Sequence, residues 1–240
     1  MSQHISRKDL KTDEIRETLA HGAEAVMSHQ RLLGIILGAA VIVGVAIFGW
    51  RIYSERQTLK ASAAFEGAMK IFEARIRAAG EPAESGELTY IGEKNKYEDA
   101  AKKLSEVARN YPRTNPGRLA RYYAALSQER LGRYDEAQKA LTELERSSDV
   151  ELAALARLQL AGVYQKTGRT DDATKLYRQL VDKPTTLVPK PLVLLTLADH
   201  LRKTNPPEAV KLYNQIRKDF PDTSIADEAE KRLELLGPVT

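Results

Sequence analysis

The side chains that most often carry chemistry are sparse in this sequence and do not cluster. The chain has 240 residues, no cysteine and only four histidines: His4, His21, His29 and His200. No pair of these histidines has the spacing of metal ligands, and thiolate or disulfide chemistry has no residue to use. The glycine-rich phosphate-binding patterns and the G-x-S-x-G nucleophile turn are also missing from the sequence. We therefore expect no catalytic residue, no cofactor, no metal site and no small-molecule substrate.

The charged residues are numerous, but their signs alternate along the chain. Lysine and arginine number 37 against 33 aspartate and glutamate, which gives a formal net charge of +4. Nucleic-acid binding needs clustered basic side chains or a row of stacking aromatic side chains. The sequence shows neither pattern, so the charges indicate a solvated helical surface and we expect no nucleic-acid partner.

One apolar stretch, Leu32 to Trp50, contains no charged residue and is bracketed by Arg31 and Arg51. As a helix it would rise about 28 Å, close to the thickness of the hydrocarbon core of a bilayer. A helix also satisfies all of its own backbone hydrogen bonds in lipid. We predict a single transmembrane helix over 32–50. An uncleaved anchor is favoured over a signal peptide, because a long charged segment precedes the stretch and no small-x-small site ends it.

The basic residues on either side of this stretch predict an orientation. Lysine and arginine number two between residues 12 and 31, and four between residues 51 and 70. The positive-inside rule alone would therefore leave the C-terminal part in the cytoplasm, although large domains are translocated despite small biases of this kind.

Two surfaces near the stretch suit contacts with other molecules. Residues 1–31 carry apolar side chains every three to four positions between 15 and 26, which predicts an amphipathic N-terminal segment. Gly34 and Gly38 form a G-x-x-x-G pattern, whose small residues let a second membrane helix approach closely. These two glycines are our candidates for helix packing in the membrane.

Residues 51–240 show helical periodicity and contain a repeated phrase of acidic residues followed by alanine. The alanines are separated by 37, 36 and 36 residues: Ala100, Ala137, Ala173 and Ala209. Four positions after each alanine stands a large apolar residue: Leu104, Leu141, Tyr177 and Tyr213. This pattern predicts stacked helix-turn-helix units, in which the alanine lets two helices press together and the larger side chain fills the next layer.

The residues around each phrase predict where helices begin and end. Gly132 and Gly168 each precede a phrase, and glycine adopts the left-handed conformation that ends a helix. The acidic residues would then begin the next helix, where they meet the positive end of its dipole. Thr223 or Ser224 would cap the last helix. Three further elements are expected: a helix over 56–79 with Ile76 on its apolar stripe, a loop over 80–95 and a capping helix over 223–236.

This pattern resembles the tetratricopeptide repeat. The copy closest to that family carries Leu160, Ala161, Tyr164, Gly168, Ala173 and Tyr177. The resemblance, together with the apolar stretch, implies an all-α protein. We expect a single N-terminal transmembrane helix, then a tetratricopeptide-like α-solenoid of about three to four helix pairs and a C-terminal capping helix. The expected parts are 1–31, 32–50 and 51–240.

By analogy with the repeat family, the inner helices would line a concave groove. Its candidate partner-binding residues are Tyr122, Leu126, Glu129, Arg130, Leu158, Gln159, Gln165 and Lys166. Some repeat proteins hold a C-terminal carboxylate with Lys and Asn at set positions, which here carry Leu119, Tyr122 and Leu126. That clamp is therefore not expected. Tyr122 and Tyr123 would suit an extended apolar chain, and they would equally suit packing inside the array.

The order of the parts resembles the YfgM-type family of bacterial inner-membrane proteins, which are ancillary subunits of the Sec translocon. The matching pieces are Lys8-Asp9-Leu10-Lys11-x-Asp13, Gly49-Trp50-Arg51 and the repeats. This resemblance implies a single-pass protein of the bacterial inner membrane with a periplasmic repeat domain. Its partners would be proteins: the Sec translocon, periplasmic chaperones or unfolded clients. The implied function is a non-enzymatic adaptor that links secreted clients to periplasmic chaperones.

Two alternatives stay open. The segment Phe220-Pro221-Asp222-Thr223-Ser224-Ile225-Ala226 resembles a phrase in outer-membrane assembly and cell-division repeat proteins, although this chain has no lipobox cysteine. That resemblance implies an envelope-assembly or cell-division scaffold. The other alternative is an enzyme-free subunit of a membrane complex whose working contact is the G-x-x-x-G pattern.

Overall fold

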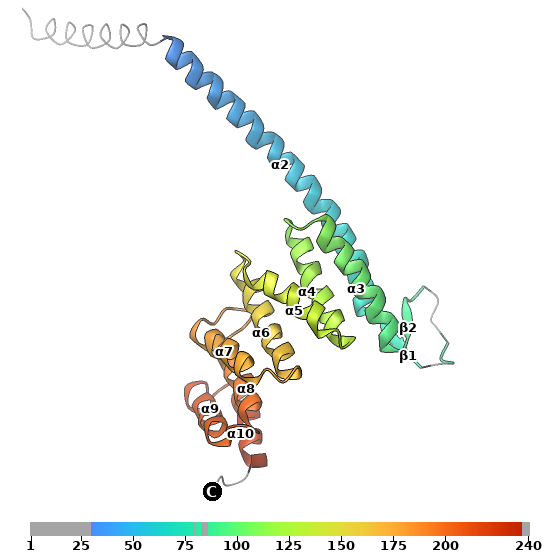
Figure 1. Ribbon diagram of the computed structural model, residues 1–240, viewed down its shortest axis with the longest axis vertical. Coiled ribbons are helices and arrows are strands. Elements are labelled where there is room, and N and C mark those ends of the chain that lie inside the picture. The colour runs from blue at the N-terminus through green and yellow to red at the C-terminus, as the bar shows by residue number, and fades with distance from the viewer. Residues whose placement is uncertain (1–29, 79, 83–85, 237–240) are drawn as a thin grey trace, which may run out of the picture. The chain divides into compact units, whose positions relative to one another are not determined.

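The computed structural model describes residues 30–78, 80–82 and 86–236 (Figure 1). The chain divides into two compact units, residues 1–56 and 57–240. The predicted amphipathic segment 1–31 lies almost entirely outside the described residues. Helix α2 (Gln30–Glu73) begins in the first unit and ends in the second.

In the first unit, α2 carries the apolar stretch with its side chains exposed from residue 34 to residue 53. Ile35, Phe48 and Trp50 are 69%, 66% and 63% exposed. From Gly34 onward, α2 is long and apolar enough to cross a membrane, with a mean hydropathy of 2.2 over its most apolar window. A contiguous exposed apolar surface of this kind is typical of a segment that contacts lipid or a partner. A signal sequence near an N-terminus meets the same criteria of length and composition.

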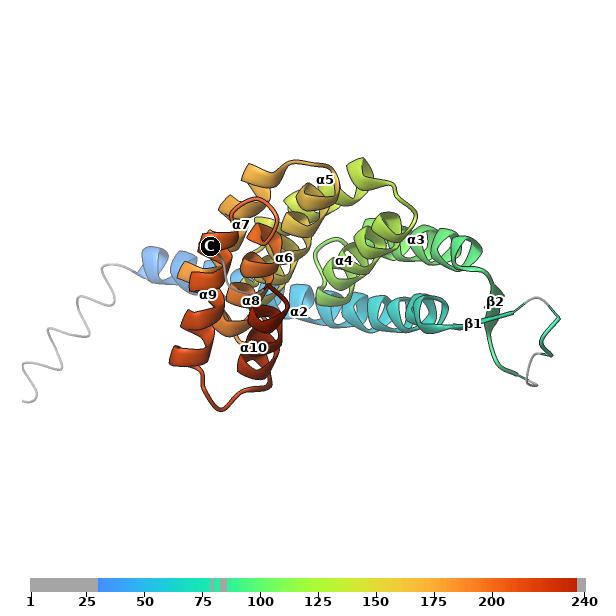
Figure 2. The ribbon, with the colours of Figure 1, turned by 90° about the horizontal axis from the view of Figure 1, so that it is seen from below.

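The second unit is a stack of helices. After the end of α2 follow α3 (Glu93–Asn110), α4 (Asn115–Arg130), α5 (Tyr134–Glu145), α6 (Val150–Lys166), α7 (Thr170–Asp182), α8 (Lys190–Leu201), α9 (Pro206–Asp219) and α10 (Ser224–Leu236). From α3 to α10 each helix packs on the next, α4 also contacts α6, and α8 contacts α10. Figure 2 shows α3 running alongside the end of α2. The predicted all-α solenoid of helix pairs with a capping helix is confirmed.

The repeated alanines lie where the helices of a pair press together. All four are completely buried, and the large residue four positions later is at most 2% exposed in each copy. Each alanine therefore sets the distance between two helices, while the larger side chain fills the layer beside it, as the spacing predicts.

Two glycines end their helices in the predicted manner. Gly132 and Gly168 both have a φ of 75°, a left-handed conformation that favours glycine. After α4, the N–H of Gly132 donates to the carbonyl of Glu129 and the N–H of Arg133 donates to that of Gln128, both at 2.9 Å. This pair of bonds satisfies carbonyls that the helix end would otherwise leave unpaired.

The prediction for residues 56–95 was partly wrong. Helix α2 ends at Glu73, and two three-residue strands follow, β1 (Arg75–Arg77) and β2 (Thr89–Ile91). They pair in parallel, with Ile76 opposite Tyr90. Ile76 is therefore not on the helical stripe. The physical reason is a set of contacts between distant residues, because the Arg75 guanidinium binds Glu81 at 2.6 Å and Glu87 at 3.2 Å.

The capping helix α10 begins as expected. The Thr223 hydroxyl accepts a hydrogen bond from the backbone N–H of Ala226 at 3.2 Å, so Thr223 and not Ser224 is the N-cap residue. Ala226 and Ala229 turn toward the core and are buried. The predicted stop at Gly237-Pro238 lies outside the described residues.

Glu151 ties the start of α6 to the loop between α7 and α8, which makes the stability of this loop depend on pH. Its carboxylate accepts hydrogen bonds from the N–H groups of Leu187 at 2.8 Å and Thr186 at 3.0 Å. These bonds, that of Leu187 foremost, hold the pKa of Glu151 below its usual value. A lowered folded-state pKa stabilises the protein above the unfolded-state pKa of about 4.3, and this contribution is lost as the pH falls through the folded-state value.

We expect Glu151→Gln to lower the melting temperature at pH 7, and the deficit to shrink at an acidic pH below the folded-state pKa of Glu151, where the wild-type carboxylate is also protonated. Thermal unfolding at both pH values measures this. Glu136→Gln is the matched control, because Glu136 also lies in the first turn of a helix and has no hydrogen bond or ion pair within the described part of the chain. A deficit that is the same at both pH values would contradict the role given to the Glu151 charge.

Candidate functional site

A cavity of about 570 Å³ lies where the first helices of three successive pairs, α2, α4 and α6, meet the start of α3. We call it the groove cavity. It is lined by Phe72, Glu73, Lys96, Tyr97, Leu126, Glu129, Arg130, Gln159 and Lys166. Five of the eight predicted partner-binding residues are among them, so the helical period brings these five together.

Glu129 forms the polar floor of the groove cavity. Its side chain is buried, and its carboxylate accepts hydrogen bonds from the Lys166 ammonium at 2.6 Å and from the Gln159 side-chain amide. Both partners lie on α6, while Glu129 lies on α4. A buried carboxylate is tolerable only when it is paired and hydrogen-bonded, and these contacts meet that requirement. They also fix the position of α4 relative to α6.

Aromatic rings form the wall on the side of α2 and α3. The Phe72 ring packs edge-on against Tyr97, with ring centroids 6.1 Å apart, and against Tyr123 at 5.1 Å. Edge-to-face contacts at this distance add about 0.5–1.5 kcal/mol beyond the burial of apolar area. The end of α2 is therefore held firmly against α3 and α4, and it gives the cavity a rigid apolar side.

Three of the predicted residues lie elsewhere. Tyr122 and Leu158 are half-buried and pack against the hydrophobic core of the repeat domain. Burial raises the pKa of the Tyr122 phenol to about 12, so this group stays protonated across the physiological range. Gln165 is exposed, and its side-chain carbonyl accepts a hydrogen bond from the Tyr177 hydroxyl at 3.4 Å. Their roles in partner binding stay predictions.

Four residues that line the groove cavity were not among the predicted partner-binding residues: Phe72, Glu73, Lys96 and Tyr97. In most copies the inner face is supplied by a helix of the repeat itself, but here the end of α2 takes that place. The apolar stripe of α2 was a usable signal for Phe72. Nothing in the sequence pattern marks Lys96.

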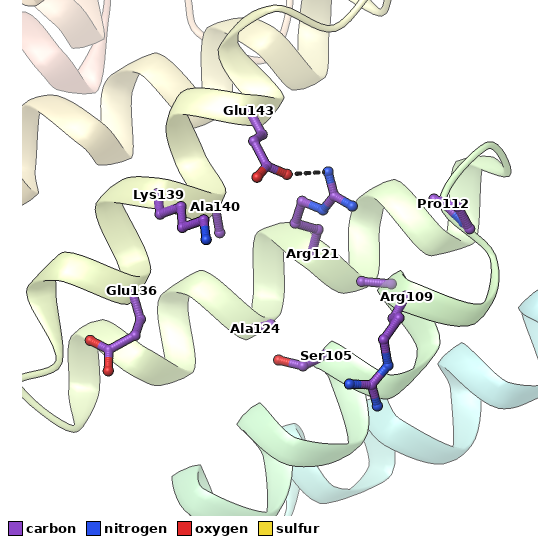
Figure 3. A pocket seen from close by; sticks show the side chains of 10 residues that line it. Ser105, Arg109, Pro112, Arg121, Ala124, Glu136, Lys139, Ala140 and Glu143 are labelled. Atoms are coloured by element: carbon purple, nitrogen blue, oxygen red, sulfur yellow. Dashed lines mark hydrogen bonds and ion pairs between the residues drawn. The ribbon is translucent and has the colours of Figure 1, made fainter.

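A second cavity, of about 390 Å³, lies between α3, α4 and α5 (Figure 3). The Arg121 guanidinium bridges to the Glu143 carboxylate at 2.6 Å across it. Both side chains are partly exposed, so this ion pair contributes at most about 1 kcal/mol. Figure 3 also shows that Arg109 and Glu136 extend from opposite sides without converging. This cavity offers no arrangement that favours a particular ligand.

Metal ligands do not gather anywhere in the described part of the chain. Within those residues there is no group of three or more histidine, aspartate or glutamate side chains that could hold a metal ion. The polar groups of the groove cavity are instead hydrogen-bond donors and acceptors beside aromatic surface, an arrangement that suits binding of a polypeptide.

The fold defines the class of protein: a helical-repeat domain of stacked helix pairs, a kind of domain typical of protein–protein interaction. The chain matches the tetratricopeptide repeat-like domain family over residues 30–184, which is more than half of its length, and it belongs to this family. Domains of this kind are in general non-enzymatic scaffolds for protein interaction. No curated protein matches the chain significantly. Helices α8 to α10 continue the same solenoid beyond the matched residues.

Proposed function

We propose that the protein is a membrane-anchored, non-enzymatic adaptor whose groove cavity binds segments of partner polypeptides. The observation that carries this proposal is the groove cavity itself, where an aromatic wall faces fixed polar groups on α4 and α6. The exposed apolar part of α2 would serve as the anchor. Anchoring raises the effective concentration of the groove for clients at the membrane.

At a finer level, we propose an ancillary subunit of the Sec translocon in the bacterial inner membrane. The protein would cross the membrane once, with its repeat domain in the periplasm, and link secreted clients to periplasmic chaperones. The support for this is the resemblance in the order of parts, from the charged lead through the Gly49-Trp50-Arg51 exit to the repeats. The four basic residues between 51 and 70 count against this orientation.

Topology is the first test of the finer proposal. Alkaline phosphatase fused to the C-terminus is expected to be active, and a fluorescent reporter that matures only in the cytoplasm is expected to stay dark. The opposite result would discard the periplasmic role and leave a docking platform on the cytoplasmic face. If the phosphatase fusion is active, co-purification in mild detergent is expected to recover translocon components. If it recovers none, the translocon assignment loses its main support, while peptide binding by the groove cavity can still be measured separately.

The two glycines of the G-x-x-x-G pattern test a separate contact. Gly34 and Gly38 are exposed, and a Cβ atom at either position would meet nothing within 4 Å. We expect the double change to leucine to leave the melting temperature of the repeat domain unchanged. If small residues mediate helix packing in the membrane, association should weaken by about fivefold or more, as for the loss of about 1 kcal/mol.

A two-hybrid or energy-transfer assay in membranes measures this association. Gly49→Leu is the control for added bulk, because Gly49 is also exposed and lies outside the G-x-x-x-G pattern. Loss of client binding by the leucine variant would instead favour a membrane-complex subunit whose working contact is this pattern. Unchanged association would show that Gly34 and Gly38 do not take part in helix packing.

A further inference from the structure

Lys96 is a largely buried residue whose ammonium forms no ion pair with any described residue. Its residue is 8% exposed, and its ammonium lies 5.3 Å from the centroid of the Tyr97 ring. No carboxylate within the described residues forms an ion pair with it. Lysine is rarely buried to this extent unless it is paired, because removing the charge from water is unfavourable. The ammonium lines the groove cavity, so a ligand there could supply the missing negative charge.

Arg130 brings a second cation to the same place. It is the last residue of α4, and its guanidinium lies 5.9 Å from the same Tyr97 ring. Arg130 also has no ion pair with any described residue, whereas the neighbouring Arg133 is paired with Glu98 at 3.0 Å. Two cations from α3 and α4 thus converge on one aromatic ring, and neither is neutralised.

The carboxylates of the groove cavity do not balance these two cations. Glu129 is already bound by Lys166 and Gln159. Glu73 is exposed and forms no ion pair with a described residue, so it lies beyond ion-pair distance from either cation. The part of the cavity around Tyr97 therefore keeps an excess of positive charge, and the apolar side chains of Phe72 and Leu126 line the same cavity.

We propose that the groove cavity binds an aspartate or glutamate side chain within an extended polypeptide, with the carboxylate between Lys96 and Arg130. This inference rests on the proposed adaptor function and names the chemistry of its partner. A neighbouring apolar side chain of the same polypeptide covers Phe72 and Leu126. Free oxygens of Glu73 accept hydrogen bonds from backbone N–H groups. A bare inorganic anion would leave the apolar wall and this acceptor unused, so a polypeptide fits better.

The arrangement differs from a clamp for the C-terminal carboxylate of a chain. The set positions of that clamp carry Leu119, Tyr122 and Leu126, and none of these is a cation. Here the two cations come from the start of α3 and the end of α4. We therefore place an internal acidic side chain in the cavity and not a chain end.

The test uses the full chain in detergent micelles and three short fluorescent peptides, each with a leucine and a phenylalanine beside the variable position. The first is amidated at its C-terminus and carries aspartate, the second is identical with asparagine, and the third carries asparagine with a free C-terminal carboxylate. Fluorescence anisotropy measures their dissociation constants. We expect the aspartate peptide to bind about tenfold more tightly than the asparagine peptide, with a preference that weakens as salt is added.

Variants assign this preference to the two cations. Lys96→Gln should abolish it, and Arg130→Gln, at an exposed position where folding is not at stake, should reduce it severalfold. Lys139→Gln is the matched control, since it removes the same charge from α5, where Lys139 lines the second cavity (Figure 3). A melting curve for each variant verifies folding.

The outcomes separate this inference from the proposed function. Equal binding of the aspartate and asparagine peptides would overturn the inference and leave the adaptor function in place. Tighter binding of the free-carboxylate peptide would also overturn it, in favour of a chain end. A preference that survives in both Lys96→Gln and Arg130→Gln would place the acidic side chain elsewhere. Failure of wild-type protein to bind any of the peptides would count against the adaptor function itself.

Discussion

Replacing Tyr213 by alanine is expected to lower the free energy of unfolding by about 3–5 kcal/mol, the cost of removing a buried aromatic side chain. Tyr213 lies on α9 and is completely buried. Its hydroxyl donates to the Asp199 carboxylate of α8 at 2.6 Å, and the Arg232 guanidinium of α10 donates to the same oxygen at 3.1 Å. The alanine would therefore leave a cavity and remove a link among the last three helices.

The loss should be local at first. In a repeat array each unit contacts only its neighbours, so parts of the array can open without the rest. Hydrogen exchange should show amide protection lost in α8–α10 of the Tyr213→Ala variant at denaturant concentrations where α3–α6 remain protected. Urea unfolding gives the total change in free energy.

Tyr213→Phe is the control that separates packing from hydrogen bonding. It keeps the ring and removes only the hydroxyl, while Asp199 keeps its contact with Arg232. We expect a loss of about 1.5–3 kcal/mol, as for one hydrogen bond to a charged group. Equal losses for the phenylalanine and alanine variants would show that the hydroxyl, and not the filled volume, holds these helices together.

The repeat positions could be predicted because close packing leaves few residue types that fit them. Where two helices press together at Ala137 or Ala173, only a small side chain is tolerated, and the layer beside it needs a large one such as Leu141. A helix that ends on a residue in the left-handed conformation restricts the residue type in the same way, as at Gly132. These restrictions act within one repeat, so they appear directly as a period in the sequence.

The strands could not be predicted because their causes lie outside this local pattern. The apolar spacing up to Ile76 is compatible with a helix, whereas β1 pairs with β2 and Arg75 forms ion pairs with Glu81 and Glu87. The Arg77 side chain adds a hydrogen bond to Thr89 of β2 at 3.1 Å. Scattered charges in a sequence do not show which of them will meet.

The residues of the groove cavity could be predicted only where they follow the repeat. Glu129 and Gln159 follow the helical period of two equivalent helices, so analogy between repeats finds them. Lys96 has no such guide, because it lies in the second helix of the first pair and reaches the cavity beside the end of α2. The irregular first pair supplies the least predictable residues of the site.

Gly117→Ala is expected to destabilise the repeat domain by about 1–3 kcal/mol or more, the usual cost of overpacking, although alanine ordinarily favours a helix. Gly117 lies in the first turn of α4. A Cβ atom there would lie 1.9 Å from the carbonyl oxygen of Tyr111 and 2.7 Å from its carbonyl carbon. Both of these atoms belong to the backbone, so no side chain can rotate away to make room.

The carbonyl of Tyr111 is also held in place, which is why the clash cannot be relieved cheaply. It accepts hydrogen bonds from the N–H of Thr114 at 3.1 Å and from the Thr114 hydroxyl at 2.9 Å. The same hydroxyl accepts from the N–H of Gly117 at 3.1 Å and so caps α4. Moving the carbonyl would therefore break the turn and the cap together, and a helix cap alone is worth about 1 kcal/mol.

Gly162→Ala provides the matched comparison, with an effect of opposite sign. Gly162 lies within α6, and a Cβ atom there would meet nothing within 4 Å. The added methyl group should restrict the unfolded chain and raise the free energy of unfolding by about 0.5–1 kcal/mol. Urea unfolding of both variants measures the two changes. If Gly117→Ala also stabilised the protein, the turn between α3 and α4 would have to yield freely, and the close approach of Gly117 to Tyr111 would not constrain how these two helices meet.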